Sequence, residues 1–116
     1  MIDINEIEGY PDKVENLSGE AFVYVLKLFD NHFYVGVTKH PKRRIVSHAR
    51  GEAVSPDWVK MYPPVEIQSV HAFDSRDRAM EQERIITLEL SSKHSAGRVR
   101  GSKWTDVDDK PPTDQV

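Results

Sequence analysis

Apolar and polar residues follow a strand-like pattern in two short stretches that are separated by a turn signal. Residues 21–29 (AFVYVLKLF) are rich in β-branched and aromatic side chains, which favour extended strands. Residues 30–31 (Asp-Asn) both tolerate the positive φ angles of tight turns. Alternation in residues 32–37 (HFYVGV) puts Tyr34 on the face opposite its aliphatic neighbours. The pattern predicts a β-hairpin.

The pattern then changes to helical and back again. Residues 41–51 start with a proline, which suits a first helical turn, and end with a glycine, which suits a helix stop. Residues 65–73 (VEIQSVHAF) predict a third strand. Asp74 or Ser75 is expected to cap a long helix that runs to about Ser92.

This order of elements, β-β-α-β-α, predicts an α+β fold in which helices flank a small three-stranded antiparallel sheet. Residues 51–64 are interpreted as a loop, and residues 93–104 as a basic loop with glycines. Residues 1–20 are expected to form a loose acidic arm before a domain that spans residues 21–104. Residues 105–116 lack apolar residues that could join a core, so a disordered acidic tail is expected.

Composition narrows the class of protein. A chain of 116 residues is one domain with a core large enough to fold. The absence of cysteine excludes disulfides, thiolate metal sites and a cysteine nucleophile. No apolar run approaches the length of a membrane span, and residues 1–10 lack the basic and apolar regions of a signal peptide. We therefore expect a soluble, cytoplasmic protein with no membrane partner.

The net charge of −3 conceals an uneven distribution. Residues 1–20 hold six acids and one base, and residues 105–116 hold four acids and one base. That leaves nine acids and fourteen bases in residues 21–104, a net charge of +5. A basic body is the footprint expected for phosphate binding. The alternative is that acidic ends only keep a small domain soluble.

Four residues of the hairpin and the first helix form a candidate catalytic set. Tyr24 and Tyr34 lie ten residues apart, Arg44 follows Tyr34 by ten, and His48 shares a helix face with Arg44. A phenol needs help to act as a base at neutral pH, and a histidine can accept its proton. An arginine presents a fork of donors that fits a phosphate. The alternatives are a core tyrosine and a solvated arginine.

The same set resembles the motifs of the GIY-YIG nucleases. Residues 22–24 (Phe-Val-Tyr) stand where that family has Gly-Ile-Tyr, and residues 34–36 (Tyr-Val-Gly) stand where it has Tyr-Ile-Gly. Arg44 and His48 follow at the family's spacing. The chain departs from the pattern at Phe22, where the family has glycine, and in lacking an asparagine near the end of the domain.

The resemblance covers roughly residues 21–104 and implies a metal-dependent endonuclease that hydrolyses phosphodiester bonds. It implies that Tyr34 activates the attacking water, that His48 relays the proton and that Tyr24 supports Tyr34 through hydrogen bonding. Arg44 would steady the phosphate as charge grows in the transition state.

The resemblance also implies one metal ion, Mg²⁺ or Mn²⁺. The family's long helix carries a glutamate four residues after an alanine, which Ala79 and Glu83 reproduce. Glu83 follows the apolar stripe of its helix, where a carboxylate is costly unless it is paired or binds a cation. Glu81 is the alternative ligand, and Glu83 could instead pair with an arginine such as Arg44.

Nucleic acid is the expected partner, DNA more than RNA, with a homodimer or a partner protein as a source of specificity. The residues expected to contact its backbone are Thr38, Lys39, Lys42, Arg43, Arg100 and Lys103. A nucleic-acid-binding module that keeps the fold but cleaves poorly is the alternative function. A protein adaptor that uses its acidic ends is the third possibility.

Overall fold

The computed structural model describes residues 3–53 and 55–101. It contains strand β1 (Ala21–Leu28), strand β2 (His32–Thr38), helix α1 (Pro41–Arg50), helix α2 (Asp57–Met61), strand β3 (Pro64–Phe73), helix α3 (Arg76–His94) and strand β4 (Val99–Gly101). None of the helices in these two ranges is long and apolar enough to cross a membrane.

The four strands form one mixed sheet in the order β3-β1-β2-β4. Strand β1 runs antiparallel to both of its neighbours, whereas β4 pairs in parallel with β2 from Phe33 to Val35. The expected α+β class is confirmed, but the expectation of three antiparallel strands is wrong. A strand of three residues is too short to show an alternating pattern of apolar and polar side chains. The sequence therefore did not predict β4, which lies within the segment expected to be a basic loop.

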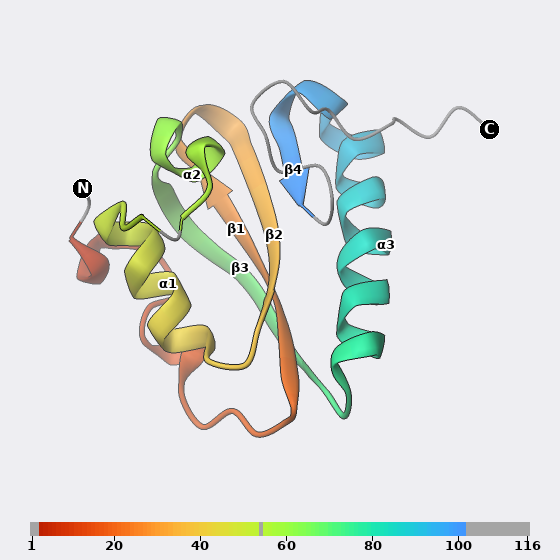
Figure 1. Ribbon diagram of the computed structural model, residues 1–116. Helices are drawn as coiled ribbons and strands as arrows, with labels where there is room; N and C mark the ends of the chain where they lie inside the picture. Colours follow the sequence, from red (N-terminus) through yellow and green to blue (C-terminus); the bar gives the residue numbers. More distant parts are fainter. Residues whose placement is uncertain (1–2, 54, 102–116) are drawn as a thin grey trace.

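Helices cover both faces of the sheet (Figure 1). On one face, Tyr24 and Tyr34 pack with Ile45 of α1 in a core that also takes in α2. On the other face, Val35 packs with Ala79 of α3. The predicted alternation along β2 is therefore confirmed, since it separates Tyr34 from the aliphatic side chains of its own strand.

The local signals for turns and helix ends are also confirmed. Asp30 and Asn31 have φ angles of 59° and 57°, the left-handed conformation that their residue types tolerate. Gly51 ends α1 with φ 64°, and its N–H bonds to carbonyls of the last turn. The hydroxyl of Ser75 accepts a hydrogen bond from the Arg78 N–H and so caps α3.

The segment of residues 3–20 is not the loose arm that its polarity suggested. Ile7 and Val14 are buried in the same core as the tyrosines. Glu8 forms a parallel bridge with Glu66 on the outer edge of β3. Ile4 and Tyr10 pack against the same core, and backbone hydrogen bonds join Glu8 to Val65 and Ile67 of β3. These contacts with β3 are distant in the sequence, so the polar composition of the segment did not predict them. The expected loop of residues 51–64 likewise contains α2.

Candidate active site

Tyr24, Tyr34 and His48 form an aromatic cluster on the face of the sheet that α1 covers. Ring centroids lie 6.2 Å apart for the two tyrosines, 5.6 Å for Tyr24 and His48, and 5.5 Å for Tyr34 and His48. Tyr24 is 1% exposed and His48 2%, whereas Tyr34 keeps 8% of its surface in contact with solvent. Of the three, Tyr34 is the one that a ligand can reach most directly.

Gly36 makes room for the phenol of Tyr24. The two residues are directly opposite each other in the β1–β2 ladder. A Cβ atom at Gly36 would collide with the Cζ and hydroxyl oxygen of Tyr24. Residue 36 therefore has to be glycine for a tyrosine to lie across the strand at this depth.

His48 is held between two hydroxyl groups. Its Nε2 lies 2.7 Å from the Tyr24 hydroxyl, and its Nδ1 lies 2.8 Å from Oγ of Ser55. The Ser55 hydroxyl donates to the Ser47 carbonyl at 3.3 Å, so its oxygen accepts the N–H at Nδ1. The tautomer follows: Nε2 carries the lone pair and accepts the hydrogen bond from Tyr24.

This arrangement differs from the relay expected between Tyr34 and His48. In the described part of the chain, no hydrogen bond joins these two side chains, and the imidazole bonds Tyr24 instead. The sequence also did not single out Ser55, which lies in the predicted loop. Its one local signal is the Ser-Pro pair at residues 55–56, a common start for a turn.

Burial keeps His48 neutral at ordinary pH. Desolvation, with a smaller effect from the nearby positive charge of Arg44, lowers the pKa of His48 from 6.5 to about 4. The Nε2 lone pair is therefore available to accept a proton at neutral pH. A protonated His48 would need additional negative charge nearby to be stable.

Arg44 and Glu83 set the charge around the two phenols. Burial, and to a smaller extent the Glu83 carboxylate, raise the pKa of Tyr34 from 10 to about 12 against the opposing effect of Arg44. Burial, and to a smaller extent Tyr34, also raise the pKa of Tyr24, whereas the positive charge of Arg44 lowers it. Four of the predicted site residues and Glu83 are thus within electrostatic reach of one another.

Glu83 reaches this cluster from the opposite layer of the fold. One helical turn after it, Thr87 packs against Gly101 at the end of β4. Glu83, one turn earlier on α3, lies close enough to Tyr24 and Tyr34 for its carboxylate to raise the pKa of both. Glu81 is exposed, whereas Glu83 is half-buried, and of the two only Glu83 affects the tyrosine pKa values.

The donor chemistry at this position fits a hard divalent cation held by few protein ligands. No group of three or more His, Cys, Asp or Glu side chains in residues 3–53 and 55–101 is arranged as a metal cluster. A half-buried carboxylate such as Glu83, next to phenol oxygens, suits Mg²⁺ or Mn²⁺, which keep several water ligands.

The predicted backbone contacts divide between the surface and the interior. Lys39, Lys42 and Arg43 are exposed around the start of α1. Thr38 is buried and its hydroxyl accepts a hydrogen bond from the His40 N–H at 3.0 Å. A cleft of about 470 Å³ has Thr38, Arg43 and other residues along its wall.

The prediction for Arg100 does not agree with the structure. Its side chain is 1% exposed, and its guanidinium lies 4.1 Å from the ring centroid of Trp58. It also donates hydrogen bonds to the Ala96 and Val99 carbonyls. Arg100 therefore joins β4 to α2 inside the protein, because a planar cation can stack in a buried aromatic setting. Lys103 and the predicted acidic tail lie outside the described residues.

Comparison with known proteins agrees with this geometry. A family model described as the GIY-YIG catalytic domain matches residues 20–96, a range that contains Tyr24, Tyr34, Arg44, His48 and Glu83. The chain therefore belongs to the GIY-YIG family of nuclease domains.

Relatives that carry the name UPF0213 protein are similar to the chain over about 70 residues. One from Natronomonas pharaonis is 33% identical over 70 residues, which is 60% of this chain and 80% of the relative. One from Halobacterium salinarum is 31% identical over 74 residues, 63% of this chain and 94% of the relative. One from Streptococcus pyogenes serotype M3 is 30% identical over 67 residues, 58% and 71% of the two chains. No solved structure matches the chain.

Proposed function

We propose that this protein is a divalent-metal-dependent endonuclease that hydrolyses phosphodiester bonds in nucleic acid, with DNA preferred over RNA. The observation that carries the proposal is the hydrogen bond between the Tyr24 hydroxyl and Nε2 of His48, beside Arg44 and Tyr34. A phenol that already donates to a neutral imidazole is arranged for proton transfer. Arg44 supplies the positive charge that a phosphate requires.

In the proposed mechanism, Tyr24 and His48 act together as the general base. The attacking water gives a proton to the Tyr24 oxygen while the Tyr24 proton moves to Nε2 of His48. The transfer has to be concerted, because burial raises the pKa of Tyr24 and disfavours a free phenolate. This replaces the direct relay from Tyr34 to His48 that the sequence suggested.

Tyr34 and Arg44 are proposed to position the reactants. Tyr34 is the more exposed phenol and would hold the water by a hydrogen bond. Arg44 would donate to phosphate oxygens and stabilise the charge that develops on them. The arriving phosphate would also offset the effect of Arg44 on the His48 pKa, which makes His48 a better proton acceptor once substrate is bound.

Glu83 is the proposed metal ligand. Mg²⁺ or Mn²⁺ held by this carboxylate and by water would neutralise charge on the phosphate and the leaving oxygen. Glu83 is half-buried and raises the pKa of both tyrosines, which supports this role more strongly than for Glu81, which is exposed.

A panel of end-labelled single- and double-stranded DNA and RNA substrates tests the function, with Mg²⁺, Mn²⁺ or a chelator. We expect cleavage that requires the metal and prefers DNA. Tyr24→Phe and Tyr34→Phe should each slow it by about 10²-fold, the scale of lost acid–base or positioning help. Tyr24→Phe should also change the pH profile, whereas Tyr34→Phe should not.

Two outcomes would refute parts of this proposal. Salt-dependent binding without cleavage of any substrate would make the protein a nucleic-acid-binding module. Cleavage at the normal rate by Tyr24→Phe, with the loss confined to Tyr34→Phe, would return the base role to Tyr34.

A further inference from the structure

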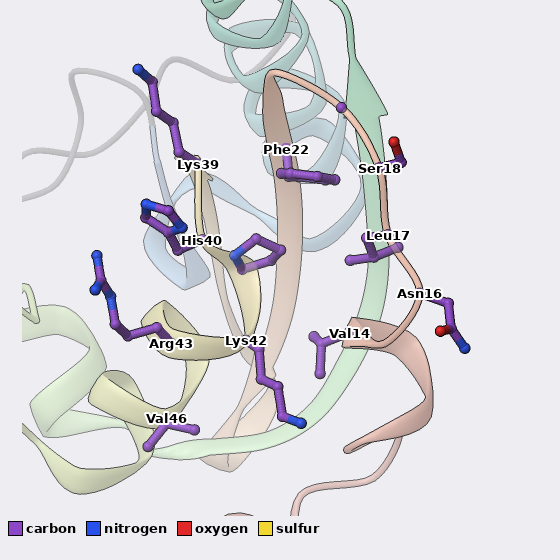
Figure 2. A pocket seen from close by; sticks show the side chains of 12 residues that line it. Val14, Asn16, Leu17, Ser18, Phe22, Lys39, His40, Lys42, Arg43 and Val46 are labelled. Carbon is purple, nitrogen blue, oxygen red and sulfur yellow. The ribbon is translucent and has the colours of Figure 1, made fainter.

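A cleft of about 840 Å³ lies between the segment of residues 3–20 and the start of α1 (Figure 2). Its volume falls within the range of small-molecule sites in proteins. Val14 and Leu17 point into it from the N-terminal segment, and Phe22 lies at the start of β1 (Figure 2). The cleft therefore has an apolar side that a flat, apolar group can cover.

The other side of this cleft is positively charged. Lys39, Lys42 and Arg43 line it, and none of its lining residues is acidic. In Figure 2, Lys39 extends outward from the segment between β2 and α1, and Arg43 from the first turn of α1. Lys42 lies 3.4 Å from the Glu15 carboxylate, but both side chains are about half exposed, so the pair holds Lys42 weakly. An apolar wall beside a row of cations complements a nucleotide, which has a flat base and an anionic phosphate.

The cleft is next to the proposed catalytic site. His40, Arg43 and Val46 line both this cleft and the smaller cleft that contains Arg44. Phe22 is two residues before Tyr24 on β1, so the two side chains leave the same face about 7 Å apart. One nucleotide can bridge that distance between the apolar wall and a phosphate at Arg44.

We propose that this cleft is a subsite for one nucleobase, taken out of its stack, from the nucleotide next to the phosphate that is cut. The inference rests on the proposed nuclease function and adds the contact that holds the strand. Phe22 stands where the GIY-YIG motif has glycine, so the aromatic wall comes from a departure of this sequence from the motif. Every base has a π-face, so the subsite accepts bases by shape.

Fluorescence anisotropy in a chelator tests the subsite without cleavage. The probes are a labelled oligothymidine of about twelve nucleotides and a strand of equal length whose nucleotides are all abasic. Wild type should bind the oligothymidine more tightly. Leu17→Ala should weaken that binding about 3- to 10-fold and leave the abasic strand unchanged, because it removes part of the apolar surface against which the base packs.

Three further variants make the result specific. Phe22→Leu keeps an apolar side chain at a buried position and should show the same selective loss as Leu17→Ala. Lys39→Ala should weaken both probes equally, since it removes a phosphate contact. Phe29→Ala, at an exposed apolar residue in the hairpin turn, is the matched control and should change neither.

The subsite is refuted if Leu17→Ala and Phe22→Leu weaken both probes equally or neither probe, while their melting temperatures show that they fold. Metal-dependent cleavage that persists in that case would leave the nuclease proposal standing. If wild type binds neither probe at low salt and cleaves nothing, both proposals fail together.

Discussion

The buried imidazole of His48 makes the stability of this fold depend on pH. Burial and Arg44 hold its pKa at about 4 in the folded protein, against about 6.5 in an unfolded chain. Between these two pH values the unfolded chain binds a proton that the folded protein excludes. The free energy of unfolding therefore decreases as the pH is lowered. The stabilisation is fully present above about pH 6.5 and is lost as the pH falls towards 4.

The size of this effect follows from the two pKa values. One pKa unit corresponds to about 1.4 kcal/mol, so the full contribution is on the order of 3 kcal/mol. His48→Gln removes the titrating group and retains a polar side chain of similar length. We expect the wild type to lose about 3 kcal/mol more than this variant between pH 7 and pH 4.

Urea unfolding followed by far-UV circular dichroism, repeated across this pH range, measures the difference. Subtracting the two curves removes the contribution of carboxylates that both proteins share. His71→Gln, at an exposed histidine of β3, is the control and should follow the wild-type curve. Parallel curves for wild type and His48→Gln would show that His48 is not held neutral by burial.

Three further substitutions test other parts of the site. Gly36→Ala should cost about 1–3 kcal/mol in urea unfolding, because its methyl group collides with the phenol of Tyr24. Glu83→Gln should abolish metal-dependent cleavage of a labelled oligonucleotide while Glu81→Gln retains it, and the reverse result would move the metal ligand to Glu81. Ser55→Ala should cost about 1–3 kcal/mol, since it leaves a buried N–H without an acceptor, and unchanged stability would show that the N–H finds another partner.

Local signals account for the parts of the fold that the sequence predicted well. The hairpin, the turn at residues 30–31 and the ends of α1 each depend on a few neighbouring residues with strong conformational preferences. The separation of Tyr34 from its aliphatic neighbours follows from the period of a strand. Such features need no knowledge of distant contacts.

The features that the sequence did not reveal depend on distant contacts. Strand β4 pairs with β2 at a point where Gly101, which has no Cβ, comes close to Val35 and Thr87. The hydrogen bond that His48 donates to Ser55 depends on how the loop after α1 folds back over the helix. Arg100 was expected on the surface because it is charged, yet a stacked contact with Trp58 and carbonyl acceptors keep it inside.

In the candidate site, too, some features follow from local sequence signals and others from distant contacts. Tyr24, Tyr34, Arg44 and His48 lie close together in the fold because the hairpin and the next helix position all of them. The identity of the hydrogen-bond partner of His48 could not be read from spacing. It depends on the depth at which Tyr24 lies against Gly36, which is a matter of packing.

The central claim is that Tyr24, Tyr34, Arg44 and His48 form a site that hydrolyses phosphodiester bonds. The cleavage rate of Arg44→Ala under single-turnover conditions tests this claim most directly. Saturating enzyme, a labelled DNA oligonucleotide and Mg²⁺ separate chemistry from binding and product release. Arg78→Ala is the matched control, because Arg78 is exposed near the start of α3. We expect Arg44→Ala to be slower by about 10²-fold or more, the scale of a lost transition-state donor. Equal rates for Arg44→Ala and Arg78→Ala would contradict the account.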